Sequence, residues 1–199
     1  MDRNSKIIAI VAAIILGAAA VLAIQSMHGT DQIPIGPTAP ADEGNTAVLY
    51  FSGTGHTKDI AEKIAGIVGA DMIEIIPSQP YTSADLDYGD SNSRTMREDA
   101  DDSSRPEISN SISLDGCSTV YLGYPIWYGD SPKIMWTFVE THDLGGKTVI
   151  PFCTSASSGI GSSAAHLKEL ADGGNWLEGK RFAIGSSESV IKEWIDSMN

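Results

Sequence analysis

Short apolar runs alternate with amphipathic segments over residues 46–199, and this alternation restricts the folds that the chain can adopt. The runs have the length of buried strands and cover residues 46–52, 71–76, 119–124, 147–153 and 180–185. Between them, apolar residues recur at helical spacing, as Ile60, Ile64 and Ile67 do in the segment 57–68. Strands that alternate with helices are typical of parallel sheets covered on both faces. We therefore predict an α/β fold with a doubly wound, five-stranded parallel sheet.

Three further helices are predicted after the third, fourth and fifth strands. The first follows Ser131 and Pro132, which suit the N-cap and the first helical position. The second covers residues 162–170, and the third ends the chain. In such sheets, ligands bind beyond the carboxyl ends of the strands. We therefore expect the functional site in the loops after the first, third and fourth strands.

Residues 77–116, which we call the excursion, do not fit this alternation. They are polar and have no strong helical face, although a short helix at 92–100 is possible. Between residues 71 and 115 there are 11 Asp and Glu residues against three arginines, a net charge of −8. We expect Arg97 and Arg105 to pair on the surface with Asp99, Asp101 or Asp102. Excursions of this length within compact domains are often functional or mobile.

The N-terminal part of the chain predicts a membrane segment and a linker. Residues 7–24 form an 18-residue run without any charged side chain. As a helix, this run would span about 27 Å, close to the hydrocarbon thickness of a bilayer. We interpret residues 1–24 as a retained transmembrane anchor, favoured by the length of the run, or as a cleaved signal segment. Arg3 and Lys6 favour a cytoplasmic N-terminus and an extracytoplasmic domain, which would be secreted if the segment were cleaved. Residues 25–45 are rich in Pro and Gly and are predicted to be a linker to the domain at 46–199.

A loop with the composition of a phosphate site joins the first strand to the first helix. It consists of Ser52, Gly53, Thr54, Gly55, His56 and Thr57. Glycines let the backbone turn its N–H groups inward, the helix N-terminus favours an anion, and the hydroxyls add donors. The loop lacks the Gly-Lys-Ser/Thr ending of a nucleotide P-loop and the third glycine of a dinucleotide fingerprint. It therefore indicates a different phosphate ligand.

This loop resembles the phosphate loop of the flavodoxins, T/S-x-T-G-x-T, at every fixed position. Two more loops resemble those that flank the flavin in that family, and they lie in the same order at strand ends. One contains Pro125, Ile126, Trp127, Tyr128 and Gly129, and the other contains Thr154, Ser155, Ala156, Ser157, Ser158 and Gly159. The resemblance implies a flavodoxin-like sheet of order 2-1-3-4-5, of the short-chain type, with FMN bound by the residues of all three loops. The last loop departs from classical members because it lacks an aromatic residue.

Within these loops, an aromatic side chain can stack on the flat isoalloxazine ring. Trp127 is the preferred candidate for this wall, with Tyr128 as the alternative. Backbone amides of a tight loop can bind the pyrimidine edge of the ring. No catalytic residue and no metal ligand is assigned.

The charge of the chain limits its partners. From residue 45 on, there are 11 Lys and Arg against 22 Asp and Glu, a net charge of −11. This charge argues against nucleic-acid binding and favours redox partner proteins with basic surfaces. We predict an electron-transfer flavoprotein tethered outside the cytoplasmic membrane. The alternatives are an FMN-dependent NAD(P)H:quinone-type reductase and a binding module without flavin, so whether the protein is an enzyme is left open.

Overall fold

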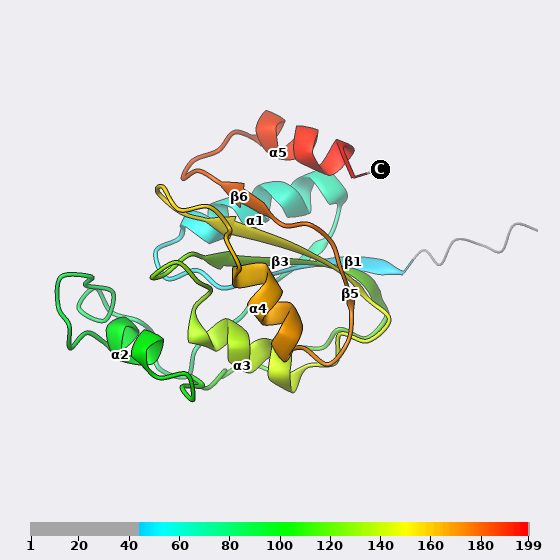
Figure 1. Ribbon diagram of the computed structural model, residues 1–199. Coiled ribbons are helices and arrows are strands. Elements are labelled where there is room, and N and C mark those ends of the chain that lie inside the picture. Colours follow the sequence, from blue (N-terminus) through cyan, green and yellow to red (C-terminus); the bar gives the residue numbers. More distant parts are fainter. Residues whose placement is uncertain (1–43, 199) are drawn as a thin grey trace, which may run out of the picture. The chain divides into compact units, whose positions relative to one another are not determined.

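The computed structural model describes residues 44–198, which form an α/β sandwich (Figure 1). All strands of its sheet are parallel and follow the order β2-β1-β3-β4-β5, with β6 also paired to β4. The strands are β1 (Asn45–Tyr50), β2 (Asp71–Glu74), β3 (Cys117–Pro125), β4 (Thr148–Thr154), β5 (Asn175–Trp176) and β6 (Lys180–Phe182). The predicted fold class and strand order are confirmed.

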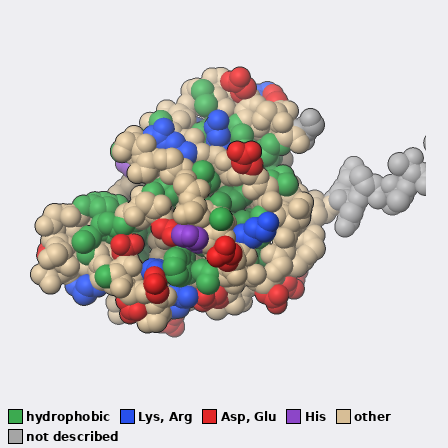
Figure 2. Space-filling model, viewed as in Figure 1, with side chains coloured by type: hydrophobic (Ala, Val, Ile, Leu, Met, Phe, Trp, Pro, Cys, Tyr) green, Lys and Arg blue, Asp and Glu red, His purple; other side chains and the backbone are tan. Residues whose placement is uncertain are grey.

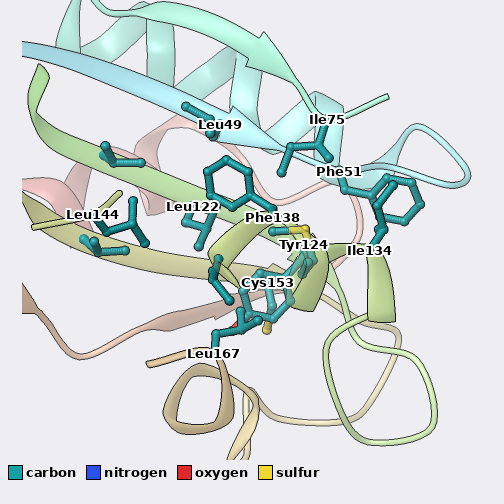
Figure 3. Packing of buried hydrophobic residues seen from close by; sticks show 14 of the residues in the cluster. Leu49, Phe51, Ile75, Leu122, Tyr124, Ile134, Phe138, Leu144, Cys153 and Leu167 are labelled. Carbon is teal, nitrogen blue, oxygen red and sulfur yellow. The ribbon is translucent and has the colours of Figure 1, made fainter. Parts of the chain in front are cut away.

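The helices cover both faces of this sheet (Figure 1). They are α1 (His56–Val68), α2 (Arg94–Ala100), α3 (Lys133–Thr141), α4 (Ser163–Leu170) and α5 (Glu188–Asp196). On one face, α1 and α5 pack with the sheet through residues such as Ile60 and Ile191. On the other face, α3 and α4 bury Phe138 and Leu167 against Leu49, Leu122 and Tyr124 of the strands (Figure 3). The helical spacing of the apolar residues explains these two cores.

The fifth position of the sheet differs from the prediction because it is divided between two short strands. β5 pairs with the first half of β4, whereas β6 pairs with its second half. Pro151 of β4 lies between the two paired stretches and has no N–H group to donate to a neighbouring strand. The carbonyl of Val149 accepts a hydrogen bond from the Leu177 N–H at 2.9 Å, so Val149 faces this edge. Pro151 lies two residues further along β4 and faces the same edge, which explains the break.

The start of α3 is also corrected. The helix begins at Lys133 with Pro132 as its N-cap, so the prediction of Ser131 as N-cap was wrong. The Ser131 hydroxyl instead accepts a hydrogen bond from Nε1 of Trp136 at 3.1 Å. That bond turns the serine toward the indole and leaves the capping position to the next residue.

The excursion leaves the sheet after β2 and returns to it before β3, with α2 inside the predicted range 92–100 (Figure 1). Its two ends are held together by backbone hydrogen bonds. The Ser78 N–H donates to the Glu107 carbonyl, and the Ser109 N–H donates to the Ile76 carbonyl, both at 2.8 Å. An antiparallel bridge joins Pro77 and Ile108 between these bonds. The excursion is therefore a large loop whose ends meet.

The predicted anchor at 1–24 and most of the predicted linker at 25–45 lie outside the described residues. β1 begins at Asn45, so the last residue assigned to the linker belongs to the sheet. Within residues 44–198, no helix has the length and the apolar character needed to cross a bilayer.

Candidate functional site

The three predicted loops meet at one cavity beyond the carboxyl ends of β1, β3 and β4. The cavity has a volume of about 190 Å³. It is lined by Thr54, His56, Leu86, Tyr88, Pro125, Ile126, Trp127, Thr154, Ser155, Ala156 and Ile184. Among these residues only histidine can carry a charge near neutral pH. The lining is therefore mainly apolar, with hydroxyls and backbone groups as its polar part.

The 52–57 loop leaves the N-terminus of α1 open toward the cavity. Gly55 is the N-cap in the left-handed region, with φ of 87°, and no side-chain hydrogen bond caps the helix. Only a residue without Cβ adopts this conformation at little cost. The Ser52 hydroxyl accepts a hydrogen bond from the Gly55 N–H at 3.0 Å, which fixes the curl of the loop. Thr54 and His56 are exposed at the mouth of the cavity.

Thr57 has a different role from the other hydroxyl residues of this loop. It is 1% exposed, and its hydroxyl shares a 2.8 Å hydrogen bond with that of Thr154. The bond joins the first helix to the end of β4. Thr57 therefore connects two of the predicted loops, and one hydroxyl hydrogen of the pair remains for another acceptor.

The 125–129 loop contains a tight turn that begins at Trp127 and has Tyr128 inside it. The N–H and C=O groups of Trp127 and Asp130 form two reciprocal hydrogen bonds of 2.9 Å. Tyr128 and Gly129 between them have φ of 50° and 91°, as in a type I′ turn. Trp127 lines the cavity, whereas Tyr128 packs against Tyr88 with ring centroids 4.8 Å apart and is absent from the lining. The two aromatic residues therefore lie in different surroundings, Trp127 at the cavity and Tyr128 against Tyr88.

Trp127 is more buried than an open stacking wall would be. The side chain is 9% exposed and makes edge contacts with Phe51 and Tyr81, at centroid distances of 5.5 and 5.2 Å. A Cβ atom on Gly53 would lie 3.0 Å from its Cζ2 atom, so the glycine lets the loop and the indole approach closely. Trp127 therefore joins the 52–57 loop, the sheet and the excursion, and it offers the cavity only part of its ring.

The 154–159 loop contributes its first half to the cavity. Thr154, Ser155 and Ala156 line it, whereas Ser157, Ser158 and Gly159 are exposed and lie outside the lining set. Cys153, just before the loop, is buried, and burial raises the pKa of its thiol to about 12. It is therefore a neutral residue of the core.

Three lining residues were missed by sequence reasoning. Leu86 and Tyr88 come from the excursion, and Ile184 follows β6. Tyr88 and Ile184 are 56% and 49% exposed, unusual for large apolar side chains. The only signal for these residues in the sequence was the aromatic Tyr88 within an acidic segment. That signal does not indicate where the excursion places the ring.

Neither Arg97 nor Arg105 forms the predicted ion pair with Asp99, Asp101 or Asp102: Arg97 donates to the Asn92 carbonyl, and Arg105 pairs with Glu140. Arg105 binds Glu140 of α3 through two hydrogen bonds of 2.6 and 2.7 Å, which lower the pKa of this carboxyl. Arg94 lies 3.9 Å from the centroid of the Tyr81 ring and binds Glu98 at 2.6 Å. The Arg105–Glu140 pair attaches the excursion to α3, whereas the contacts of Arg94 lie within the excursion. Neither arginine lines the cavity.

Comparison with known proteins identifies relatives of this domain. The flavodoxin family model matches residues 45–198. Two solved proteins from Bacteroides eggerthii and Bacteroides uniformis, provisionally named flavoproteins, are each 43% identical to it. They cover 77% of this chain and 97% and 98% of their own, with TM-scores of 0.72 and 0.73. A flavoprotein from Lactobacillus acidophilus, solved in complex with FMN, is 25% identical, with coverage of 76% and 99% and a TM-score of 0.58. A search of curated proteins finds no match.

Proposed function

This chain belongs to the flavodoxin family, and on that basis we propose that it binds FMN and transfers electrons between partner proteins. One observation carries the proposal: the cavity joins an open helix N-terminus to an apolar lining at the carboxyl ends of three parallel strands. A phosphate and a flat ring need these two environments side by side. The FMN complex of the Lactobacillus acidophilus relative supports the same ligand.

The phosphate end of the ligand suits the 52–57 loop. Backbone N–H groups at the start of α1 and the hydroxyls of Ser52 and Thr54 supply donors, and the helix dipole favours negative charge. His56 lines the cavity beside them and adds an imidazole donor. The loop contains no Lys or Arg, so affinity here comes from oriented neutral donors. We infer that the site prefers FMN to riboflavin, which lacks the phosphate.

The ring end of the ligand suits the apolar side of the cavity. Tyr88 and Leu86 of the excursion and Trp127 of the 125–129 loop provide apolar surface, and the backbone of residues 154–156 provides polar groups. A volume of about 190 Å³ is smaller than cavities that enclose drug-sized ligands. We infer that one edge of the ring stays exposed. When bound, FMN would supply the one- and two-electron redox chemistry, while this chain binds and orients it.

The exposed edge and the charge of the domain support the choice of an electron-transfer role. The described part of the chain is strongly acidic, and an acidic surface steers encounters with basic partners. The excursion carries the exposed Tyr88 ring, and Figure 2 shows hydrophobic side chains gathered at this end of the molecule. We infer that redox partners with basic surfaces approach near the excursion.

The location of the domain is part of the same proposal. The apolar run at residues 7–24, with Arg3 and Lys6 before it, supports a membrane anchor and a domain outside the cytoplasmic membrane. Protease treatment of intact cells should then remove the domain from the surface. Protection of the domain in intact cells, together with digestion after lysis, would contradict an external location.

Flavin titration tests the binding proposal. We expect the full chain in detergent to bind FMN more tightly than riboflavin. Thr54→Val should weaken FMN binding about ten-fold, as for loss of a hydrogen bond to a charged group, and leave riboflavin binding nearly unchanged. The control, Thr141→Val, alters an exposed threonine at the end of α3 and should change neither affinity. Equal losses for both flavins would exclude the 52–57 loop as the phosphate site.

A redox titration tests the electron-transfer role. An electron carrier should show two separable one-electron steps and should not oxidise NAD(P)H at an appreciable rate. Rapid NAD(P)H oxidation with a quinone as acceptor would instead support the reductase alternative. A chain that binds no flavin would support the binding-module alternative.

A further inference from the structure

The side chain of Arg181 holds the loop that follows β4. Arg181 lies in β6 directly beside Cys153 of β4 and is half-buried. Its Nη2 atom donates to the carbonyl oxygens of Ser155 and Ala156, at 2.8 and 2.9 Å. Its Nε atom donates to the Ser155 hydroxyl at 3.2 Å. One guanidinium therefore fixes three groups of two consecutive residues.

These bonds determine where the opposite sides of the peptide groups point. In a trans peptide, the C=O and the following N–H point in opposite directions. The two carbonyls face Arg181, so the N–H groups of Ala156 and Ser157 face away from it. Ser155 and Ala156 line the cavity, whereas Arg181 does not. The arginine thus turns two amide donors toward the side of the loop where the cavity lies.

The two amide donors remain available for a ligand. The Ser155 N–H binds the Phe182 carbonyl at 3.4 Å, which attaches the start of the loop to β6. Within residues 44–198, the structure gives no acceptor for the N–H groups of Ala156 and Ser157. Two adjacent free amides, polarised by a guanidinium on their carbonyl side, bind an electron-rich edge well.

We propose that Arg181 is a positioning residue that orients the Ala156 and Ser157 amides toward the polar edge of a bound flavin ring. The inference rests on the proposed function and adds a residue outside the cavity to it. The arginine also places a positive charge behind this loop, in a domain that is otherwise strongly acidic. That charge favours the negative charge that reduction adds beside the amides, and so it raises the midpoint potential.

Three variants separate the geometry of Arg181 from its charge. Arg181→Gln removes both the fork of donors and the charge, whereas Arg181→Lys keeps the charge and loses the fork. Lys180→Gln, at the exposed neighbouring position of β6, is the control for net charge. Each variant is measured as the full chain for FMN affinity, riboflavin affinity and midpoint potential. Amide exchange of residues 154–159 is measured without flavin.

The expected pattern differs between the variants. Arg181→Gln should speed exchange in the loop, weaken FMN and riboflavin binding equally by about ten-fold, and make the potential more negative. Arg181→Lys should weaken binding similarly but keep a potential close to that of the unchanged chain. Lys180→Gln should change neither exchange nor affinity. The equal loss for both flavins is the signature of the ring edge, because only FMN carries the phosphate.

Two outcomes would overturn the inference in distinguishable ways. If the unchanged chain binds FMN and Arg181→Gln binds it within about two-fold of that affinity, the positioning role of Arg181 is wrong and the proposed function stands. If the unchanged chain binds neither flavin, the proposed function fails and the role of Arg181 fails with it. In that case the exchange data show only whether the arginine orders the loop.

Discussion

Replacement of Trp127 by alanine tests whether this indole holds the excursion on the sheet. A tryptophan that is nine-tenths buried removes roughly 200 Å² of surface from water. At about 25 cal/mol per Å², this burial corresponds to about 5 kcal/mol. That value lies at the upper end of the range of roughly 3–5 kcal/mol for truncation of a buried tryptophan to alanine. The contacts with Phe51 and Tyr81 are lost together with this burial. We therefore expect the free energy of unfolding of Trp127→Ala to fall by about 4–5 kcal/mol.

The assay combines urea unfolding, followed by far-ultraviolet circular dichroism, with amide exchange. Exchange should increase within the excursion more than in the strands, because Tyr81 loses one of its two aromatic partners and keeps only Phe51. Trp127→Phe keeps a ring at the joint and should lose only about 1–2 kcal/mol. Trp194→Ala removes a half-buried indole from α5, on the opposite face of the sheet, and should leave exchange in the excursion unchanged. A loss below about 1 kcal/mol for Trp127→Ala would refute the reasoning and restore Trp127 as an open wall.

Four further predictions follow from single contacts. A Cβ atom on Gly123 would lie 2.2 Å from Cζ of the buried Phe152 ring, so Gly123→Ala should cost about 1–3 kcal/mol in urea unfolding, and Phe152→Leu in the same chain should recover part of it. Tyr88→Ala should weaken binding of FMN and riboflavin to a similar extent in fluorescence titrations, because the ring lines the apolar side of the cavity. Iodoacetamide at pH 8 should label the half-exposed Cys117 in the native chain, and mass mapping should find Cys153 unlabelled until the chain unfolds. The folded chain keeps the Cys153 thiol protonated up to a pKa of about 12, above its ordinary value of 9.0, so its contribution to stability is complete below pH 9 and is lost as the pH rises toward 12. The difference in stability between the unchanged chain and Cys153→Ala should therefore narrow over that range, and a constant difference would contradict the assignment.

Much of the site could be predicted because its residues are neighbours in the sequence. The 52–57 loop follows an apolar strand and precedes an amphipathic helix, so its position at the strand end came from the sequence alone. The loops at 125–129 and 154–159 were placed by the same reasoning. Their first residues lie where that reasoning predicted, at the carboxyl ends of β3 and β4.

The remaining contributors depend on contacts between distant segments. Tyr88 reaches the cavity because the excursion folds back on the sheet through Tyr81 and Trp127, which no local pattern encodes. Arg181 reaches the 154–159 loop because β6 pairs in register with the end of β4. Pro151 is visible in the sequence, but whether it divides the fifth strand into β5 and β6 depends on which edge of β4 the proline faces. These are tertiary relations, and hydrophobic periodicity does not report them.

The hydrogen bonds that join the two ends of the excursion have a consequence for how the sequence of such a protein can change in evolution. The bonds between Ser78 and Glu107 and between Ser109 and Ile76 bring the chain back to the point where it left β2. The two ends of the excursion therefore lie close together beside the sheet, as the ends of a short connection would. Substitutions, insertions or exchange of the whole segment can change which molecules the domain meets while the strand register and the 52–57 loop stay intact. The domain is in this sense modular, because sequence changes confined to the excursion can alter its partners.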